Sequence, residues 1–426
     1  MTERLVEPPR RPFRARVVVP GDKSLSHRSL LLAAMAAGRS EIHGLGPGLD
    51  VQSTLTAVQA LGAAWDPPVL ASAGVAAWSP PPGRIDCGNS GTTMRLLLGA
   101  LCGRPFTVEL VGDESLSRRP MQRVAHPLRR LGADVELSSG GQAPIRVTGG
   151  DLVGVDIEID IASAQVRSAF ELAAVQAAGE SLISSPPGYR DHTERMLEAY
   201  GRGKRISGET FRVIPGPIPR ARYEVPGDPS SAAFLWASAA LLPGAVVETP
   251  GVSLNPGRLG FLQVLEAMGA EVSALVTGTF HGDVVGDVTV GGAGGLVGVE
   301  VPADEVAGMI DELPLVAVLG AGAEGRTVVA GAGELRHKES DRITMTIAMI
   351  RALGGVGEEG ADWLAVSGPR PLRGGAVDAH GDHRIAMAAA VAATAARGPV
   401  AISGAGAASV SWPGFFDVLE AMWSSR

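Results

Sequence analysis

Apolar patterning typical of helices recurs along the chain at a nearly constant interval. The residues Phe261, Leu262, Val264, Leu265 and Met268 show the i, i+3, i+4 spacing of one helix face. Similar segments end at positions 62, 132, 201, 269, 354 and 423, of which the first five are glycines. Successive positions are 70, 69, 68, 85 and 69 residues apart. A period of this kind indicates a repeated supersecondary unit with several elements in each copy.

Short strand-like runs accompany these helices, at 16–19, 106–111, 133–137, 155–159 and 327–330. The pattern predicts six α/β units, of which the first five have a helix closed by a C-terminal glycine. The segments 19–22 and 225–228 are both Val-Pro-Gly-Asp, and each precedes an apolar helix. We therefore expect two similar domains of three units each. The first would cover 16–223, and the second would combine 1–15 with 224–426.

Two of the predicted helix starts carry residues suited to anions. The segment 88–95, Gly-Asn-Ser-Gly-Thr-Thr-Met-Arg, leads into one apolar run, and 21–28, Gly-Asp-Lys-Ser-Leu-Ser-His-Arg, leads into another. The first amides of a helix have no partner within the helix, and the dipole there favours anions. We expect Ser24 to be the N-cap of the helix that it opens. The chain should therefore hold small phosphorylated or carboxylated molecules at helix N-termini.

Composition narrows the class of protein. The 426 residues are 45% hydrophobic and 19% charged, with a net charge of −8, which disfavours a nucleic-acid binder that relies on a basic surface. The two cysteines, Cys87 and Cys102, provide no disulfide framework. We find neither a signal-peptide layout nor an apolar run long enough to span a bilayer. A soluble cytoplasmic protein is expected.

Further charged segments lie at the borders of apolar stretches, and each taken alone also fits helix capping or a solvated surface. They are 117–121, 163–168, 189–194, 309–314, 334–342 and 380–387. Asp311, between apolar residues, has the setting of a proton acceptor. On a helix, Lys338 and Arg342 would share a face. Arg384 is favoured as an anion clamp. A metal site at His380 and His383 is disfavoured because no cysteine or third histidine lies nearby in the sequence.

Taken together, these motifs resemble the 5-enolpyruvylshikimate-3-phosphate synthase family over essentially the whole chain. In the family's order they are Gly-Asp-Lys-Ser (21–24), Gly-Asn-Ser-Gly-Thr-Thr-Met-Arg (88–95), Arg-Pro (119–120), Ser-Ala-Gln (163–165), Ile-Asp-Glu (310–312), Lys-Glu-Ser-Asp-Arg (338–342) and Asp-His-Arg (382–384). The resemblance implies an α/β fold of two similar domains, each of three βαβαββ-type repeats in an inside-out α/β barrel. It implies a two-strand hinge and an active site in the cleft between the domains.

The activity implied is transfer of the enolpyruvyl group of phosphoenolpyruvate to the 5-hydroxyl of shikimate 3-phosphate, with loss of phosphate from a tetrahedral intermediate. The resemblance implies contacts to shikimate 3-phosphate from Lys23, Ser24, Arg28, Ser163, Gln165, Arg190, Asp311 and Lys338. It implies contacts to phosphoenolpyruvate from Lys23, Gly91, Arg119, Gln165, Arg342 and Arg384. Asp311 would take the hydroxyl proton, Lys23 and Glu339 are the candidate proton carriers, and Asn89 and His383 would support the site. No cofactor or metal is implied.

The sequence departs from the family pattern at three positions and leaves alternatives open. Ala164 stands where some members have serine, Glu334 where some have asparagine, and Val410 where many have lysine. Gly91 usually accompanies inhibition by glyphosate, but other positions also tune that property. One alternative is the sister transferase acting on UDP-N-acetylglucosamine, which typically uses a loop cysteine. Another is a non-catalytic phosphate- or carboxylate-binding protein. A monomer is expected.

Overall fold

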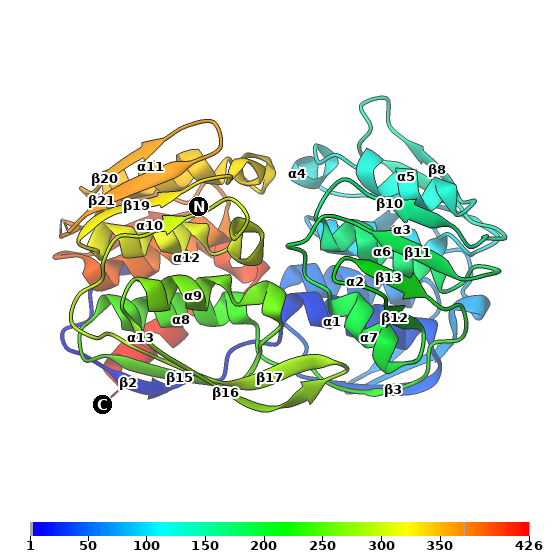
Figure 1. Ribbon diagram of the computed structural model, residues 1–426, viewed down its shortest axis with the longest axis horizontal. Helices are drawn as coiled ribbons and strands as arrows, with labels where there is room; N and C mark the ends of the chain where they lie inside the picture. The colour runs from blue at the N-terminus through cyan, green and yellow to red at the C-terminus, as the bar shows by residue number, and fades with distance from the viewer. Residues whose placement is uncertain (1–2, 370, 426) are drawn as a thin grey trace. The chain divides into compact units, whose positions relative to one another are not determined.

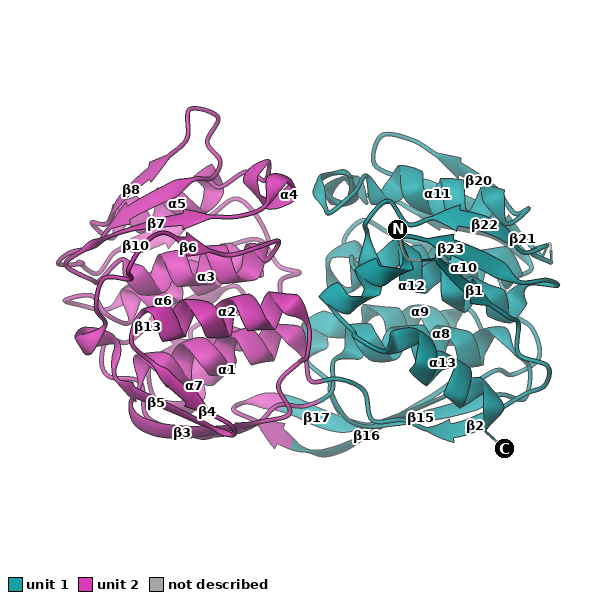
Figure 2. Cartoon of the chain, turned by 180° about the vertical axis from the view of Figure 1, so that it is seen from behind, with its two compact units in different colours: residues 1–20, 227–278, 284–426 teal, residues 21–226, 279–283 magenta. Residues whose placement is uncertain are grey.

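The computed structural model describes residues 3–369 and 371–425. In this part of the chain the strands form six sheets, and contacts divide the chain into two compact units (Figure 2). Unit 1 comprises Met1–Pro20, Gly227–Gly278 and Val284–Arg426, and unit 2 comprises Gly21–Pro226 and Thr279–Asp283. The chain therefore passes from one unit to the other after Pro20, Pro226, Gly278 and Asp283.

Unit 2 contains three four-stranded sheets with one shared pattern. Each begins with a parallel pair and continues with two antiparallel pairs, in the orders β14-β3-β5-β4, β6-β7-β9-β8 and β10-β11-β13-β12. The strands are β3 (Ala37–His43), β4 (Ala64–Asp66), β5 (Val69–Ala73), β6 (Ile85–Asp86), β7 (Thr107–Val111), β8 (Asp134–Leu137), β9 (Ile145–Thr148), β10 (Asp156–Glu158), β11 (Ser181–Ser184), β12 (Gly203–Arg205), β13 (Thr210–Val213) and β14 (Arg222–Glu224). The helices are α1 (Lys23–Met35), α2 (Leu49–Ala60), α3 (Gly91–Leu101), α4 (Glu114–Ser117), α5 (Gln122–Arg130), α6 (Ala164–Ala174) and α7 (His192–Ala199).

Unit 1 holds the sheets β16-β17-β15-β2, β18-β19-β21-β20 and β1-β23-β22. Its strands are β1 (Glu3–Val6), β2 (Arg14–Arg16), β15 (Val246–Ser253), β16 (Glu271–Phe280), β17 (Asp283–Gly291), β18 (Glu300–Val301), β19 (Gly325–Val329), β20 (Val356–Glu359), β21 (Leu364–Gly368), β22 (Gly375–Asp378) and β23 (Val400–Ser403). Its helices are α8 (Pro229–Leu241), α9 (Gly260–Ala267), α10 (Leu313–Gly322), α11 (Arg342–Ala352), α12 (His383–Ala392) and α13 (Phe415–Ser424). The end of β16 and the start of β17 belong to unit 2.

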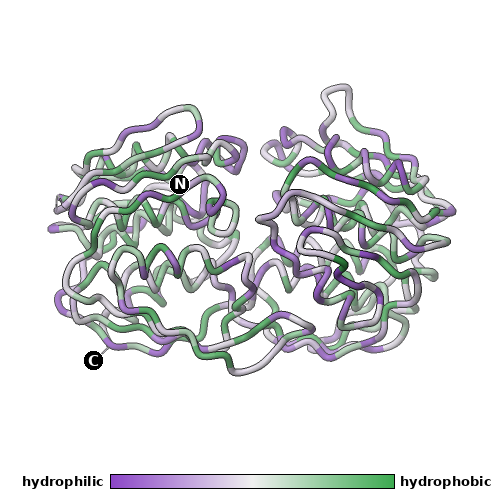
Figure 3. Tube along the Cα trace, viewed as in Figure 1, coloured by the Kyte–Doolittle hydropathy of each residue, from purple (hydrophilic) through white to green (hydrophobic). Residues whose placement is uncertain are grey.

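The core of each unit is built on three helices that are buried along almost their whole length. They are α1, α3 and α6 in unit 2 and α8, α10 and α12 in unit 1. Helix α10, Leu-Pro-Leu-Val-Ala-Val-Leu-Gly-Ala-Gly, is apolar on every face, as an interior helix must be. Strands such as β7 and β9 alternate buried and exposed residues, so each turns one face outward. Helices therefore fill each unit and sheets cover it (Figures 1 and 3).

The sixfold repeat predicted from the sequence is confirmed. Each repeat has one buried helix followed by a second, more exposed helix, and five of these second helices (α2, α5, α7, α9 and α11) are followed by a glycine two residues after their last residue. Gly62, Gly132, Gly201, Gly269 and Gly354 all have positive φ, between 66° and 109°. This left-handed conformation is the one that glycine supplies at a helix C-terminus without steric cost.

Two local predictions were wrong, and the helix considered for the charged run 334–342 does not extend over it. Asp22, not Ser24, caps α1, because its Oδ1 accepts from the Leu25 amide at 2.8 Å and so places Ser24 inside the first turn. The strand predicted at 16–19 ends at Arg16, ahead of Pro20, which has no amide to donate. The charged run 334–342 is not one helix: a 3₁₀ turn (Gly333–His337) precedes α11, which starts at Arg342 after the cap Asp341.

No helix in the described part of the chain has both the length and the apolar character needed to cross a membrane.

Candidate active site

In unit 2 the first turns of α1, α3 and α6 carry most of the residues predicted from the sequence. Asp22, Ser90 and Ser163 cap these helices through their side-chain oxygens. The caps at Ser90 and Ser163 satisfy one amide each, at 3.2 Å from Thr93 N and 3.4 Å from Val166 N. The sequence placed both of these helix starts correctly.

Arg28 is held from three directions within unit 2. Its Nε donates to Thr193 Oγ1 at 2.7 Å, its Nη2 to Ser168 Oγ at 2.7 Å and its Nη1 to the Ser24 carbonyl at 2.9 Å. The residue is only 3% exposed, and burial lowers the pKa of the Arg28 guanidinium. These contacts bring the first turn of α7 against α1 and α6, which places the loop containing Arg190 beside this region.

Lys23 and Gln165 are both oriented by polar partners. The Lys23 ammonium lies 3.0 Å from Asp50 Oδ2, at the start of α2. The amide of Gln165 is held at both ends, because Arg95 Nη1 donates to its Oε1 at 2.5 Å and its Nε2 donates to Thr92 Oγ1 at 2.9 Å. An amide fixed in this way has a defined donor and acceptor side.

Gly91 lies beside two guanidinium groups. A Cβ on Gly91 would stand 2.7 Å from Arg95 Nη1 and 3.3 Å from Arg119 Nη1. Arg119 Nη2 donates to Asn89 Oδ1 at 3.2 Å, and Asn89 Nδ2 in turn donates to Asp113 Oδ2 at 2.7 Å. Two arginines, Arg95 of α3 and Arg119 from the segment after α4, therefore lie next to a residue without a side chain.

In unit 1 the predicted residues meet at Arg342, whose side chain is 1% exposed. Its guanidinium donates to Asp382 from Nε at 2.8 Å and Nη2 at 3.2 Å, to Glu339 Oε2 at 2.6 Å, and to Asp311 Oδ1 at 3.4 Å. Lys338 Nζ lies 3.7 Å from the same Asp311 oxygen. Four predicted residues from two separate motifs, 310–312 and 338–342, are thus in one cluster.

Asp382 is the partner that makes burial of Arg342 possible. The carboxylate is fully buried, and although desolvation acts to raise its pKa, the Arg342 guanidinium holds the pKa of Asp382 below its usual range. The same carboxylate raises the pKa of Arg342 against the effect of burial. Asp382 also caps α12 by accepting from the Arg384 amide at 2.8 Å.

Arg384 and His383 follow this cap and are buried with it. Arg384 Nη1 lies 3.6 Å from Glu312 Oε1, donates to the Ser230 carbonyl at 3.3 Å, and the guanidinium stacks over the Phe234 ring at 5.6 Å. Burial lowers the pKa of His383 to about 4, so this ring is neutral at physiological pH. The first turns of α8, α10 and α12 are therefore adjacent in unit 1.

Sequence reasoning missed several functional partners. Asp50 gave no signal, and Thr193 lay in the segment 189–194 without a role, because their contacts are with side chains far away in the sequence. Arg95 was seen in a helix start without a role. Asp382 was seen in the Asp-His-Arg motif, where its spacing suits a cap, but nothing in the sequence pairs it with Arg342.

The two residue sets differ in charge. The unit 2 set has five cations, Lys23, Arg28, Arg95, Arg119 and Arg190, and Asp50 lies 3.0 Å from the first of them. The unit 1 set has three cations, Lys338, Arg342 and Arg384, in contact with Asp311, Glu312, Glu339 and Asp382. The first arrangement suits binding of polyanions, and the second combines anion binding with carboxylates able to move protons.

The histidine, cysteine and acidic side chains of the described residues are the groups suited to a metal site, and the two thiols are buried. Among them, no group of three or more histidine, cysteine or acidic side chains is placed to hold a metal ion. Burial raises the pKa of the Cys87 thiol to about 12, and Cys102 is fully buried with its pKa raised for the same reason. A thiol in this state is a poor nucleophile.

Comparison with known proteins gives one consistent result. Residues 8–419 match the family model described as EPSP synthase (3-phosphoshikimate 1-carboxyvinyltransferase). The chain is 44% identical to the 3-phosphoshikimate 1-carboxyvinyltransferase of Pelotomaculum thermopropionicum, over 96% of each chain, and 41% identical to that of Shouchella clausii, over 95% of this chain and 96% of the other. It is also similar to the solved structure of EPSP synthase from Acinetobacter baumannii, with a TM-score of 0.88 and 35% identity over 99% of this chain and 98% of the other.

Proposed function

The chain belongs to the EPSP synthase family, and from this premise we propose how its residues carry out the reaction. The enzyme transfers the enolpyruvyl group of phosphoenolpyruvate to the 5-hydroxyl of shikimate 3-phosphate and releases phosphate. The observation that carries the proposal is the Arg342 cluster, in which Asp311 and Glu339 pair with one buried guanidinium and Lys338 lies 3.7 Å from the same Asp311. A binding protein would have no need of carboxylates among its cations.

The residues of unit 2 are proposed to bind most of the anionic groups. Lys23, Ser24, Arg28, Ser163, Gln165 and Arg190 take shikimate 3-phosphate. Capped helix starts and guanidinium groups are the usual protein partners of phosphate and carboxylate. Lys23, Gly91, Arg119 and Gln165 take phosphoenolpyruvate, and Asn89 keeps Arg119 in place through their 3.2 Å hydrogen bond.

The residues of unit 1 are proposed to act on the same pair of substrates. Arg342 and Arg384 bind phosphoenolpyruvate, Lys338 and Asp311 contact shikimate 3-phosphate, and His383 supports them as a neutral buried ring. Asp311 stands 3.4 Å from Arg342 and 3.7 Å from Lys338. Its carboxylate is therefore held by cations in a fixed position, as a proton acceptor requires.

The proposed chemistry proceeds by addition and elimination. A proton from Glu339 or Lys23 is added to C3 of phosphoenolpyruvate, making a methyl group, while the 5-hydroxyl oxygen bonds to C2 and gives its proton to Asp311. The resulting tetrahedral intermediate then returns a proton from that methyl group to the side chain that supplied it, as the C2–O bond to phosphate breaks. The departing phosphate takes up one proton, which balances the proton that the 5-hydroxyl gave to Asp311. The products are the enolpyruvyl ether and inorganic phosphate.

Asp311 supplies the sharpest test of these roles. We expect Asp311→Asn, which keeps the shape of the side chain, to lower kcat by at least about a hundredfold, the scale of a positioned proton transfer. The measurement is phosphate release from phosphoenolpyruvate in the presence of shikimate 3-phosphate. Glu305→Gln, a nearby exposed carboxylate, serves as the matched control. Turnover of Asp311→Asn within a few-fold of the wild type would overturn the assignment.

The same assay separates the alternatives. Phosphate release that depends on UDP-N-acetylglucosamine instead would identify the sister activity, and its absence with either acceptor would leave a binding protein. Inhibition by glyphosate is proposed on the basis of Gly91 and is tested by adding glyphosate to this assay. A monomeric state and a cytoplasmic location remain predictions from the sequence.

A further inference from the structure

The turn that joins β16 to β17 belongs to unit 2, although most of both strands belongs to unit 1. We call residues 279–283 the hairpin tip. The tip packs on α7 so closely that a Cβ on Gly282 would stand 2.9 Å from the Arg195 carbonyl oxygen, and Gly282 has a φ of +90°. His281 also has a positive φ, 43°, which is uncommon for a residue with a side chain and persists only where neighbours enforce it.

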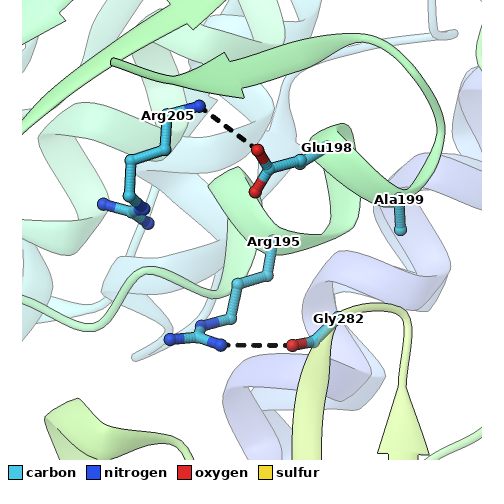
Figure 4. A pocket seen from close by; sticks show the side chains of 5 residues that line it. All are labelled: Arg195, Glu198, Ala199, Arg205 and Gly282. Carbon is cyan, nitrogen blue, oxygen red and sulfur yellow. Dashed lines mark hydrogen bonds between the residues drawn. The ribbon is translucent and has the colours of Figure 1, made fainter. Parts of the chain in front are cut away.

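Several contacts enforce this conformation. His281 Nε2 hydrogen-bonds the Arg222 carbonyl at 3.1 Å, and its ring packs against Tyr223 and Tyr200, with centroids 4.9 and 5.4 Å away. Arg195 Nη1 donates to the Gly282 carbonyl at 3.1 Å (Figure 4). Figure 4 shows this contact at the edge of a cavity of about 270 Å³ lined by Arg195, Glu198, Ala199, Arg205 and Gly282. The tip is thus fixed against α7.

The strongest contact of the tip is made by Asp283. Its Oδ2 lies 2.7 Å from His192 Nδ1, and both side chains are fully buried although they are 91 residues apart in the chain. A carboxylate only accepts, so the ring donates its Nδ1–H. Asp283 Oδ1 also lies 3.5 Å from Arg195 Nε. A buried carboxylate needs such partners, because an unpaired buried charge is costly.

The contacts of Asp283 and Arg195 involve the two residues that follow Arg190, which are Asp191 and His192. His192 is held directly by Asp283. Asp191 is held by Arg195, whose Nε donates to Asp191 Oδ1 at 2.7 Å, and by Arg205, whose Nη2 donates to Asp191 Oδ2 at 2.7 Å. The hairpin tip therefore holds Asp191 and His192 in place, and these residues directly follow the arginine that is proposed to bind shikimate 3-phosphate.

We infer that the hairpin tip fixes the backbone of Arg190 through Asp283 and His192, so that Asp283 is a positioning residue for shikimate 3-phosphate. The inference rests on the proposed function, since it gives Arg190 its ligand. Asp283 contacts no substrate itself. When Asp283 is lost, the loop before α7 has one anchor fewer, and Arg190 samples positions from which its guanidinium no longer meets the ligand.

The test compares Asp283→Ala and Asp283→Asn with the wild type. We expect Asp283→Ala to raise KM for shikimate 3-phosphate about tenfold, the worth of one charge-assisted hydrogen bond, with a much smaller change in kcat and in KM for phosphoenolpyruvate. Asp283→Asn retains an oxygen that can accept from His192 and should lie between the two. Asp287→Ala is the matched control, because this aspartate of β17 accepts instead from the Gly251 amide at 2.8 Å.

A second readout does not depend on catalysis. Hydrogen–deuterium exchange without ligands should become faster in residues 186–195 of Asp283→Ala and stay unchanged there in Asp287→Ala. Faster exchange in a protein whose wild type lacks the shikimate 3-phosphate activity would support the anchor while refuting the proposed function. The inference would be overturned if Asp283→Ala is active and its exchange in residues 186–195 is unchanged. It would also be overturned if the exchange is faster but KM for shikimate 3-phosphate is unchanged. If Asp283→Ala lowers the stability of the protein but changes neither the exchange of residues 186–195 nor KM for shikimate 3-phosphate, Asp283 is a structural residue only and the inference is wrong.

Discussion

The buried pair of Asp382 and Arg342 allows a quantitative prediction. Asp382→Ala removes the two hydrogen bonds from Arg342 at 2.8 and 3.2 Å, the cap on the Arg384 amide at 2.8 Å, and the acceptor of the Ser340 hydroxyl at 2.9 Å. Breaking a buried ion pair costs about 3–5 kcal/mol. Because Glu339 and Asp311 still neutralise Arg342, the lower end applies, and the lost cap adds about 1 kcal/mol.

We therefore expect Asp382→Ala to lower the free energy of unfolding by about 4 kcal/mol. Asp382→Asn keeps an oxygen suited to the cap and should cost about 2–3 kcal/mol. The assay is urea unfolding at pH 7, followed for the transition that includes unit 1. Asp341→Ala is the control: it removes a cap from α11 and an ion pair with Arg336, but at a side chain 38% exposed, and should cost about 1 kcal/mol.

The pH dependence of the free energy of unfolding tests the same ion pair. The pKa of Asp382 is lowered in the folded state, so the pair stabilises the protein above the unfolded pKa of about 3.9 and loses this contribution as the pH falls through the folded value. The difference between wild type and Asp382→Asn should shrink below about pH 4. A cost for Asp382→Ala no larger than that of Asp341→Ala would refute the reasoning that the buried pair organises this cluster.

Two further predictions concern unit 2. Gly91→Ala places a methyl group 2.7 Å from Arg95 Nη1, which holds Gln165, so we expect KM for phosphoenolpyruvate to rise at least about fivefold; steady-state kinetics with an unchanged KM would contradict this. Burial lowers the pKa of His27 from 6.5 to about 3, so as the pH falls the ring is protonated in the unfolded chain before it is protonated in the folded protein. The free energy of unfolding therefore falls as the pH drops below about 6.5, by up to about 1.4 kcal/mol per pH unit. In urea unfolding at several pH values, His27→Gln should show a shallower loss than the wild type, and equal slopes would argue against a neutral buried ring.

The repeat was predictable from the sequence because it rests on local rules. Apolar spacing identified the helices, and the glycines from Gly62 to Gly354 marked their ends, since only a left-handed residue closes those turns cheaply. The helix starts at Ser90 and Ser163 were predictable for the same reason, because a cap acts within three residues. The wrong cap at Ser24 shows the limit: Asp22 suits the position equally well, and local sequence does not choose between the two.

The pairing of charges was not predictable in this way. Nothing in the sequence links Arg342 to Asp382, Arg28 to Thr193, or His192 to Asp283, because each pair joins elements separated by tens of residues. Such pairs are selected by burial, since a charge removed from water must find a partner wherever the packing brings one. The Arg342 cluster is therefore a product of how α10, α11 and α12 pack.

The sequence by itself determined the six repeats, the helix starts that carry the candidate residues, and the chemical types able to hold two anionic substrates. These features depend on spacing, propensity and caps, which act over a few residues. Only the tertiary structure decided which carboxylate neutralises which guanidinium, that Arg95 and Thr92 orient Gln165, and that a hairpin from the other half of the chain fixes the loop of Arg190. Those outcomes depend on desolvation and packing, which exist only once distant segments are buried together.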